Sequence, residues 1–343
     1  MMNKRNSILN VIFLVIVFAI TLYYIFHGQD MHTLLNYIKN TDVRYWFLAV
    51  ICVILFIGCE SLIIYYMMHT IQQKISLLHC FLYSFVGFFF CNITPSATGG
   101  PPAQLYYMKK DKVPLPIATL VLMIVTITYK LVLVAIGLIV IIIRPFGIMH
   151  YLSPVLGICY LGLSLNIICV VFMVLLVFHP TMTRNLLLGI VKILKSLHVM
   201  KQTDYLTKKI EHALKQYQDV AMYFRTHKLV VMNVFIITIF QRLLLFYVTY
   251  LTYLSFGLHG TGIITIITLQ AMISVAVEML PLPGGMGISE KLFLMIFTPL
   301  FGNLTLPAMV VSRGLSYYTE LIISALFTIV SHFVIKEKIE RVK

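Results

Sequence analysis

Long apolar runs separated by short polar stretches dominate the chain. The longest runs reach or approach the roughly 20 residues that a helix needs to cross the hydrocarbon core of a bilayer. The first run follows Lys4 and Arg5, but it is long for a signal peptide and ends without a small-residue cleavage site, so we expect it to be retained. We predict full spans at residues 8–26, 45–69, 115–143, 152–178, 229–256 and 307–335.

Two further apolar stretches, 77–108 and 262–301, are interrupted by proline and glycine. Proline removes a backbone donor and glycine weakens a helix, and unpaired backbone in hydrocarbon costs several kcal/mol per group. We therefore predict two re-entrant helical hairpins whose breaks are surrounded by protein or water. Two unrelated kinks in ordinary helices are the alternative. The break residues are Pro95, Ser96, Gly99, Gly100 and Pro101 in the first hairpin, and Pro281, Pro283, Gly284, Gly285 and Gly287 in the second.

Charge supports the membrane assignment and orients the chain. Charged residues make up 11% of the sequence, against about 25% in a soluble domain. The formal net charge of +14 is concentrated at segment ends, which indicates cytoplasmic loops rather than a nucleic-acid site. Six spans starting inside bring both termini to the cytoplasmic face. The first hairpin then enters from the cytoplasm, and the second enters from outside.

These patterns predict an all-α integral membrane protein with an inverted-repeat-like arrangement. We expect a first membrane half at 1–180, a basic connector at 181–228 and a second half at 229–343. The connector contains apolar residues at helical spacing between Leu186 and Leu197, which predicts an amphipathic helix at the interface or, alternatively, a docking site for a soluble partner. In inverted-repeat transporters, broken helices meet near the midplane and form the substrate site.

Ionisable residues within or beside the apolar stretches are the candidate site. A charge at the bilayer centre costs at least about 2.5–3.5 kcal/mol, so these side chains should face an interior or a watery cavity. We expect Arg313 to pair with Glu278 or Glu290, and Lys130 or Arg242 to pair with Glu60 or Glu320. Static ion pairing between helices is the alternative to head-group binding. The candidates are Glu60, Lys130, Arg242, Glu278, Glu290, Arg313, Tyr317 and Glu320, with Lys291 the weakest addition.

Other chemistry finds no support in the motifs. The six cysteines lie in apolar stretches without CxxC spacing, and neither HExxH nor a Walker motif occurs, so we expect no disulfide, metal or cofactor. Helices that restart after the breaks, near Ala103–Leu105 and Ile288–Glu290, would offer amide N–H groups to a phosphate.

Two segments carry a family resemblance. Asn92–Gln104, followed by Lys109–Pro114, and Pro281–Glu290 resemble the two signatures of the transmembrane domain of lysylphosphatidylglycerol synthase/flippase, also called multiple peptide resistance factor. The resemblance covers nearly the whole chain. The chain differs from the full family pattern in two ways. Eight residues follow Ile335, which implies a stand-alone form without the aminoacyltransferase domain. Gln104 stands where relatives often carry a basic residue.

The resemblance implies a flippase in the cell membrane that moves an anionic or aminoacylated phospholipid, such as lysyl-phosphatidylglycerol, and thereby contributes to resistance to cationic peptides. We expect a transporter rather than an enzyme. The alternatives are a phosphatidylglycerol lysyltransferase and a carrier for a polyprenyl lipid or small solute. Expected partners are membrane phospholipids, with a separate aminoacyltransferase and a second copy of the chain as further candidates.

Overall fold

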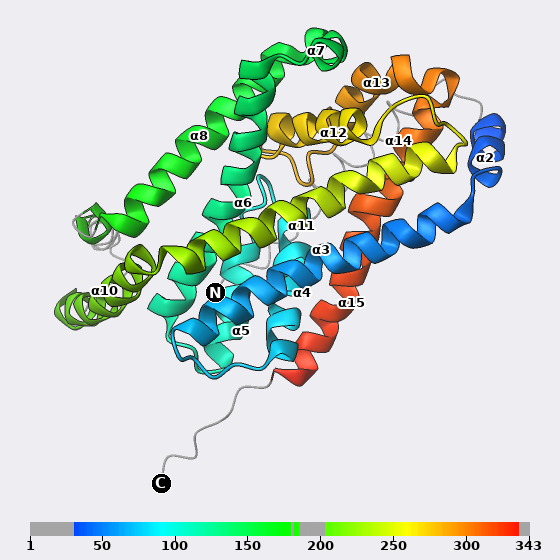
Figure 1. The fold of residues 1–343 in the computed structure, drawn as a ribbon. Coiled ribbons are helices and arrows are strands. Elements are labelled where there is room, and N and C mark those ends of the chain that lie inside the picture. Colours follow the sequence, from blue (N-terminus) through cyan, green and yellow to red (C-terminus); the bar gives the residue numbers. More distant parts are fainter. Residues whose placement is uncertain (1–30, 180–181, 186–188, 190–202, 336–343) are drawn as a thin grey trace.

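The computed structural model describes residues 31–179, 182–185, 189 and 203–335 (Figure 1). Across these residues the chain forms helices and a single isolated β-bridge, which confirms the all-α prediction. The predicted first span at 8–26, most of the amphipathic segment around Leu186–Leu197 and the basic tail after Ile335 lie outside the described residues.

Five helical segments in the described part are long and apolar enough to cross a bilayer, and they agree with five of the predicted spans. Of the first four, three are single long helices, and the third in chain order is a long helix preceded by two short helical elements. The last segment continues from the second hairpin through α14, a π-helical turn η3 and α15. These elements are α3 (Val43–Thr70), α6 (Leu115–Ile143), α7 (Phe146–Leu152), η1 (Ser153–Val155), α8 (Leu156–Phe178), α11 (Lys228–Ser255), η2 (Gly302–Leu304), α14 (Thr305–Arg313), η3 (Gly314–Tyr318) and α15 (Thr319–Val334).

Both interrupted stretches form helix–break–helix units, as predicted. The first consists of α4 (Leu77–Ile93) and α5 (Gly100–Lys110), and the second of α12 (Ile263–Val277) and α13 (Ile288–Phe301). A helix of 15–17 residues is only about 23–26 Å long, so neither α4 nor α12 traverses a full bilayer alone. The units lie toward opposite ends of the bundle (Figure 1).

The packing of the two halves is reciprocal. Helix α3 lies against α11, α4 packs on α15, and α12 packs on α6 and α8. The first limb of each hairpin therefore contacts the spanning segment that follows the other hairpin. An inverted repeat would give this exchange, while the membrane orientation of each half stays a prediction.

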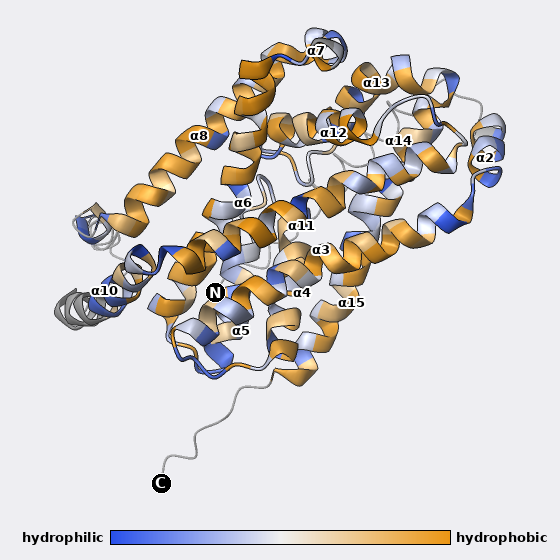
Figure 2. Cartoon of the chain, in the orientation of Figure 1, coloured by the Kyte–Doolittle hydropathy of each residue, from blue (hydrophilic) through white to orange (hydrophobic). Residues whose placement is uncertain are grey.

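The two ends of the bundle have separate apolar cores. One core joins the end of α3 and the starts of α4, α6 and α11 to α10 (Thr203–Thr226), through residues such as Met68, Tyr83 and Phe224. The other joins the end of α6 to α8, α12, α13 and α14, through residues such as Met272 and Phe297. Large apolar side chains on the outside of the bundle, such as Ile142 and Ile264, are 74% exposed, which fits contact with lipid. Hydrophobic residues cover most of the long helices (Figure 2).

Helix α8 approaches α12 closely at Gly162. A Cβ atom at this position would overlap the backbone of Val275 and Ala276. The side chain of Asn166, one turn further along α8, donates a hydrogen bond to the Val275 carbonyl at 3.2 Å. The small residue therefore allows the contact that holds the second hairpin against the first half.

We predict that Gly162→Ala destabilises the protein because backbone atoms cannot move aside as a flexible side chain can. The expected cost is about 1–3 kcal/mol, as for an overpacked core. Gly157→Ala, on the same helix with no atom near its added Cβ, is the matched control and should be neutral or slightly stabilising. Thermal unfolding in detergent measures both, and equal melting temperatures would contradict this packing.

Candidate functional site

The two hairpin breaks meet inside the bundle. Pro95 and Pro283 form an isolated antiparallel bridge, and the Ser96 hydroxyl donates to the Leu280 carbonyl at 3.2 Å. Backbone groups that have left a helix need such partners, because the bilayer core offers no water. The polar backbone groups of each break therefore find part of their partners in the other break. This mutual dependence explains why the chain has two breaks rather than one.

The breaks also share one backbone conformation. In the first, the Thr98 N–H bonds to the Pro95 carbonyl around two residues with positive φ, at +51° and +53°; in the second, the Met286 N–H bonds to Pro283 around φ of +56° and +66°. Positive φ at both central positions defines a type I′ turn. Glycine takes this conformation freely in the second turn, whereas Ser96 and Ala97 in the first bear a cost of about 1–2 kcal/mol each.

The last spanning segment connects the two breaks. Tyr317 donates its hydroxyl hydrogen to the Asn92 carbonyl at 2.9 Å, and Arg313 Nη2 donates to the Gly284 carbonyl at 2.9 Å. The Arg313 guanidinium also lies over the Tyr317 ring, 4.6 Å from its centroid. Arg313 directly precedes the π-helical turn η3 and Tyr317 lies within it; such a local widening often occurs at functional sites.

Arg313 pairs with Glu290, which is one of the two partners predicted for it. Arg313 Nε lies 2.8 Å from Glu290 Oε1, and Glu290 Oε2 accepts hydrogen bonds from the Gly287 N–H at 2.6 Å and the Ser289 hydroxyl at 2.9 Å. The carboxylate thus caps the start of α13.

The helix starts predicted to offer amide N–H groups to a phosphate offer fewer than expected, because the Ala103 N–H bonds to the Gly99 carbonyl and the Ser289 N–H to the Gly285 carbonyl. At α13 the N-cap N–H is already bonded to Glu290. Helix α5 begins at Gly100, earlier than expected, and its next two residues, Pro101 and Pro102, have no N–H, while the Gly99 N–H bonds to the Thr94 hydroxyl at 2.8 Å. Neither restart presents a run of free amides.

Lys130 and Arg242 converge on Glu278, so the prediction that they pair with Glu60 or Glu320 is wrong. Lys130 Nζ lies 3.2 Å from Glu278 Oε1, and Arg242 Nη2 lies 2.6 Å from Oε2. The end of α12 carries Glu278 between α6 and α11, a position that depends on where the break falls in space. The Arg242 guanidinium also stacks on Tyr129, 3.2 Å from the ring centroid.

Glu60 and Glu320 have amide partners instead. Gln104 Nε2 donates to Glu60 Oε1, and Asn92 Nδ2 donates to Glu320 Oε1, each at 2.8 Å. Both carboxylates are more than nine-tenths buried. Gln104 reaches Glu60 across Gly87, whose missing side chain leaves room for the amide.

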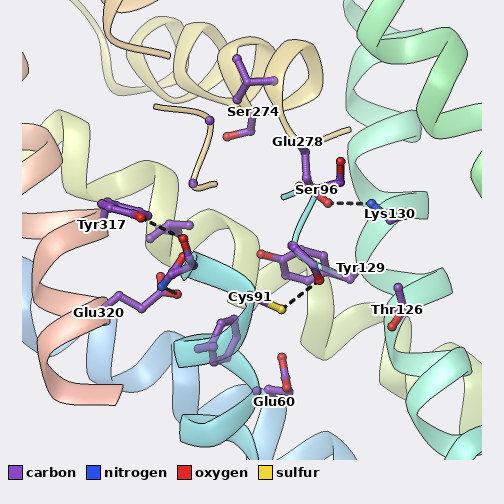
Figure 3. Close-up of a pocket in the computed structure, with 18 of the residues that line it drawn as sticks. Glu60, Cys91, Ser96, Thr126, Tyr129, Lys130, Ser274, Glu278, Tyr317 and Glu320 are labelled. Atoms are coloured by element: carbon purple, nitrogen blue, oxygen red, sulfur yellow. Dashed lines mark hydrogen bonds and ion pairs between the residues drawn. The ribbon is translucent and has the colours of Figure 1, made fainter. Parts of the chain in front are cut away.

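These groups surround a cavity of about 250 Å³ at the junction of the breaks (Figure 3). Of the predicted site residues, Glu60, Lys130, Glu278, Arg313, Tyr317 and Glu320 line it, as do the break residues Ser96, Pro101, Gly284 and Gly285. Arg242 and Glu290 stand behind the wall and hold lining residues by ion pairs. Lys291 follows Glu290 on α13 and is not part of the lining.

Prediction from charge alone missed the neutral part of the lining. Asn92 and Gln104 flank the first break, and Tyr129 precedes Lys130. Gln270 and Ser274 lie one turn apart on α12. Uncharged polar side chains next to a predicted break, or at helical spacing toward a buried charge, are the signal that could have found them.

Comparison with known families gives one match. A family model described as the lysylphosphatidylglycerol synthase TM region matches residues 10–324. A comparison with curated proteins finds no match.

We predict that Gly284→Ala lowers the melting temperature more than Gly257→Ala does. Both glycines have positive φ, at +56° and +73°, so both substitutions strain the backbone, but only a Cβ at Gly284 would overlap the Tyr317 ring. The additional loss should be about 1–3 kcal/mol. Thermal unfolding of both variants measures the difference, and an equal loss would refute the contact between the break and the last span.

Proposed function

Because the chain belongs to the family of lysylphosphatidylglycerol synthase transmembrane regions, we propose that it moves the head group of an anionic or aminoacylated phospholipid between the leaflets of the cell membrane. The observation that supports this is a cavity with charged side chains in its wall, between two helix breaks within a multi-pass apolar bundle. Intramembrane charges are costly, and a path for a charged head group is one reason to retain them.

The size of the cavity indicates what it would hold. At about 250 Å³ it is smaller than the roughly 300–1,000 Å³ of pockets that enclose a drug-sized ligand. A head group is the part of a phospholipid that fits such a space, and the acyl chains would stay in the bilayer against the exposed apolar helices.

Two cations are available to a phosphate. Lys130 and Arg313 line the cavity, each bound to a carboxylate that a phosphate could replace. The Lys130–Glu278 contact is the longer of the two contacts at Glu278, and Arg242 would keep Glu278 neutralised after Lys130 turned away. We propose that Lys130 is the first cation to meet the head group.

The distribution of basic residues supports a cytoplasmic position for the end that contains α5 and α10. In the described part of the chain, this end carries Lys74, Lys109, Lys110, Lys112, Arg184, Lys208, Lys209, Lys215, Arg225 and Lys228, whereas the opposite end carries Lys39, Arg44 and Arg144. Under the positive-inside rule the first hairpin then opens to the cytoplasm and the second to the outer face. Movement of an aminoacylated lipid outward would reduce negative surface charge.

The test is leaflet exchange in proteoliposomes containing fluorescent phosphatidylglycerol or lysyl-phosphatidylglycerol, with outer-leaflet label quenched chemically. We predict exchange faster than in protein-free vesicles. Ser274→Phe should slow it at least about tenfold, because the added ring enters the cavity. Ile264→Phe, on the lipid-exposed side of α12, should keep the wild-type rate.

Thermal unfolding of both variants separates a blocked cavity from a damaged fold. Wild-type exchange no faster than in empty vesicles for either lipid would contradict translocation of these lipids. Formation of lysyl-phosphatidylglycerol from lysyl-tRNA by the purified chain would favour the transferase alternative, and exchange by Ser274→Phe at the wild-type rate would exclude this cavity as the path.

A further inference from the structure

Four carboxylates lie in or behind the wall of the cavity, and they are of two kinds. Glu278 and Glu290 each lie within 3.2 Å of a basic side chain. Glu60 and Glu320 line the same cavity, yet within the described part of the chain neither has a basic side chain at ion-pair distance.

The three basic side chains near the cavity are already paired, so none of them can pair with Glu60 or Glu320 without leaving its present carboxylate. Arg242 and Lys130 are bound to Glu278, and Arg313 is bound to Glu290. Four carboxylates against three cations leave one excess negative charge if all of them are ionised. A buried carboxylate with no counter-charge costs several kcal/mol, and such a group takes up a proton instead.

The amide contacts suit both protonation states. Gln104 and Asn92 each donate to one oxygen, Oε1, of their carboxylate. A protonated carboxyl group can accept that bond on one oxygen and carry its proton on the other, whereas an ionised one gains further bonds from water. Exclusion of water from the cavity would therefore favour the protonated form of each carboxyl group, and entry of water would favour the ionised form.

The surrounding charges do not remove this dependence of the protonation state on water in the cavity. The Arg242 guanidinium acts on both carboxylates, Arg313 acts on Glu320, and Glu60 and Glu320 repel each other when both are ionised. Among neutral neighbours, Gln241 on α11 is a second amide beside Glu60. The other titratable groups facing the cavity or its wall are Cys91, Tyr129, Lys130, Glu278, Glu290 and Tyr317.

We propose that Glu60 and Glu320 take up and release protons as the cavity closes and opens, so that lipid movement is coupled to a transmembrane proton gradient. The inference rests on the proposed lipid translocation. The two carboxylates come from different halves of the chain, α3 and α15, so both would respond when the halves separate. A proton fits the site better than a metal cation, because amide N–H groups point at both carboxylates and the described residues contain no group of three or more His, Cys, Asp or Glu side chains that could hold a metal.

The experiment uses the full chain in proteoliposomes with a pH-sensitive dye inside and labelled lipid in the membrane. For the wild type we expect a pH gradient to change the exchange rate at least about threefold relative to equal pH on both sides, with proton flux accompanying lipid movement. Glu60→Gln and Glu320→Gln, which mimic the protonated side chain, should lose this response. Asp219→Asn, the same chemical change on the exposed side of α10, should retain it.

The outcomes distinguish this inference from the function beneath it. Wild-type lipid exchange at a rate unaffected by the pH gradient overturns proton coupling and leaves translocation intact, and a response to a sodium gradient instead also overturns it. Absence of lipid exchange under every gradient overturns translocation itself. If either amide variant fails to fold, as judged by thermal unfolding, the gradient response and proton flux of the wild type still decide the question.

Discussion

A helix break inside a bilayer has backbone groups that no solvent can satisfy, and the rest of this structure depends on how they are satisfied. Pro95 and Pro283 bring two type I′ turns together, and Ser96 bonds across the junction. Because each turn needs the other, the hairpins must extend far enough from opposite ends to meet. The cavity exists at this junction because two tight turns cannot fill the space that two continuous helices would.

The positions of the paired charges depend on that junction. A break ends α12 just before Glu278, which then lies within reach of Lys130 and Arg242. It also lets α13 begin where Glu290 can both cap the helix and bind Arg313. Tyr317 then ties the last span to the first hairpin through Asn92. The Lys130–Glu278 pair joins the two halves, whereas Arg242–Glu278 and Arg313–Glu290 lie within the second half. Lys130, Glu278 and Arg313 also line the cavity, so contacts that stabilise the fold are contacts that a head group would meet.

Sequence patterns predicted the spans and the breaks because hydrophobic length and Pro/Gly interruptions are local signals. The same patterns gave Glu290 as one of two partners predicted for Arg313, and these two residues lie on consecutive segments. They failed for Lys130 and Arg242, since no local signal says that Glu278 projects between α6 and α11. They also failed for the helix starts, where Pro101 and Pro102 remove donors that a generic helix would offer. The π-helical turn between Arg313 and Glu320 depends on tertiary packing and has no sequence signature of its own.

The head-group site is tested most directly by cryo-electron microscopy of the full chain in lipid nanodiscs made with phosphatidylglycerol. We predict head-group density in the cavity between the two turns, with its phosphate near Lys130 or Arg313 and its acyl chains outside the bundle. A well-resolved cavity that holds only water, with every lipid confined to the outer belt, would contradict the claim that the meeting of the two breaks creates a head-group site.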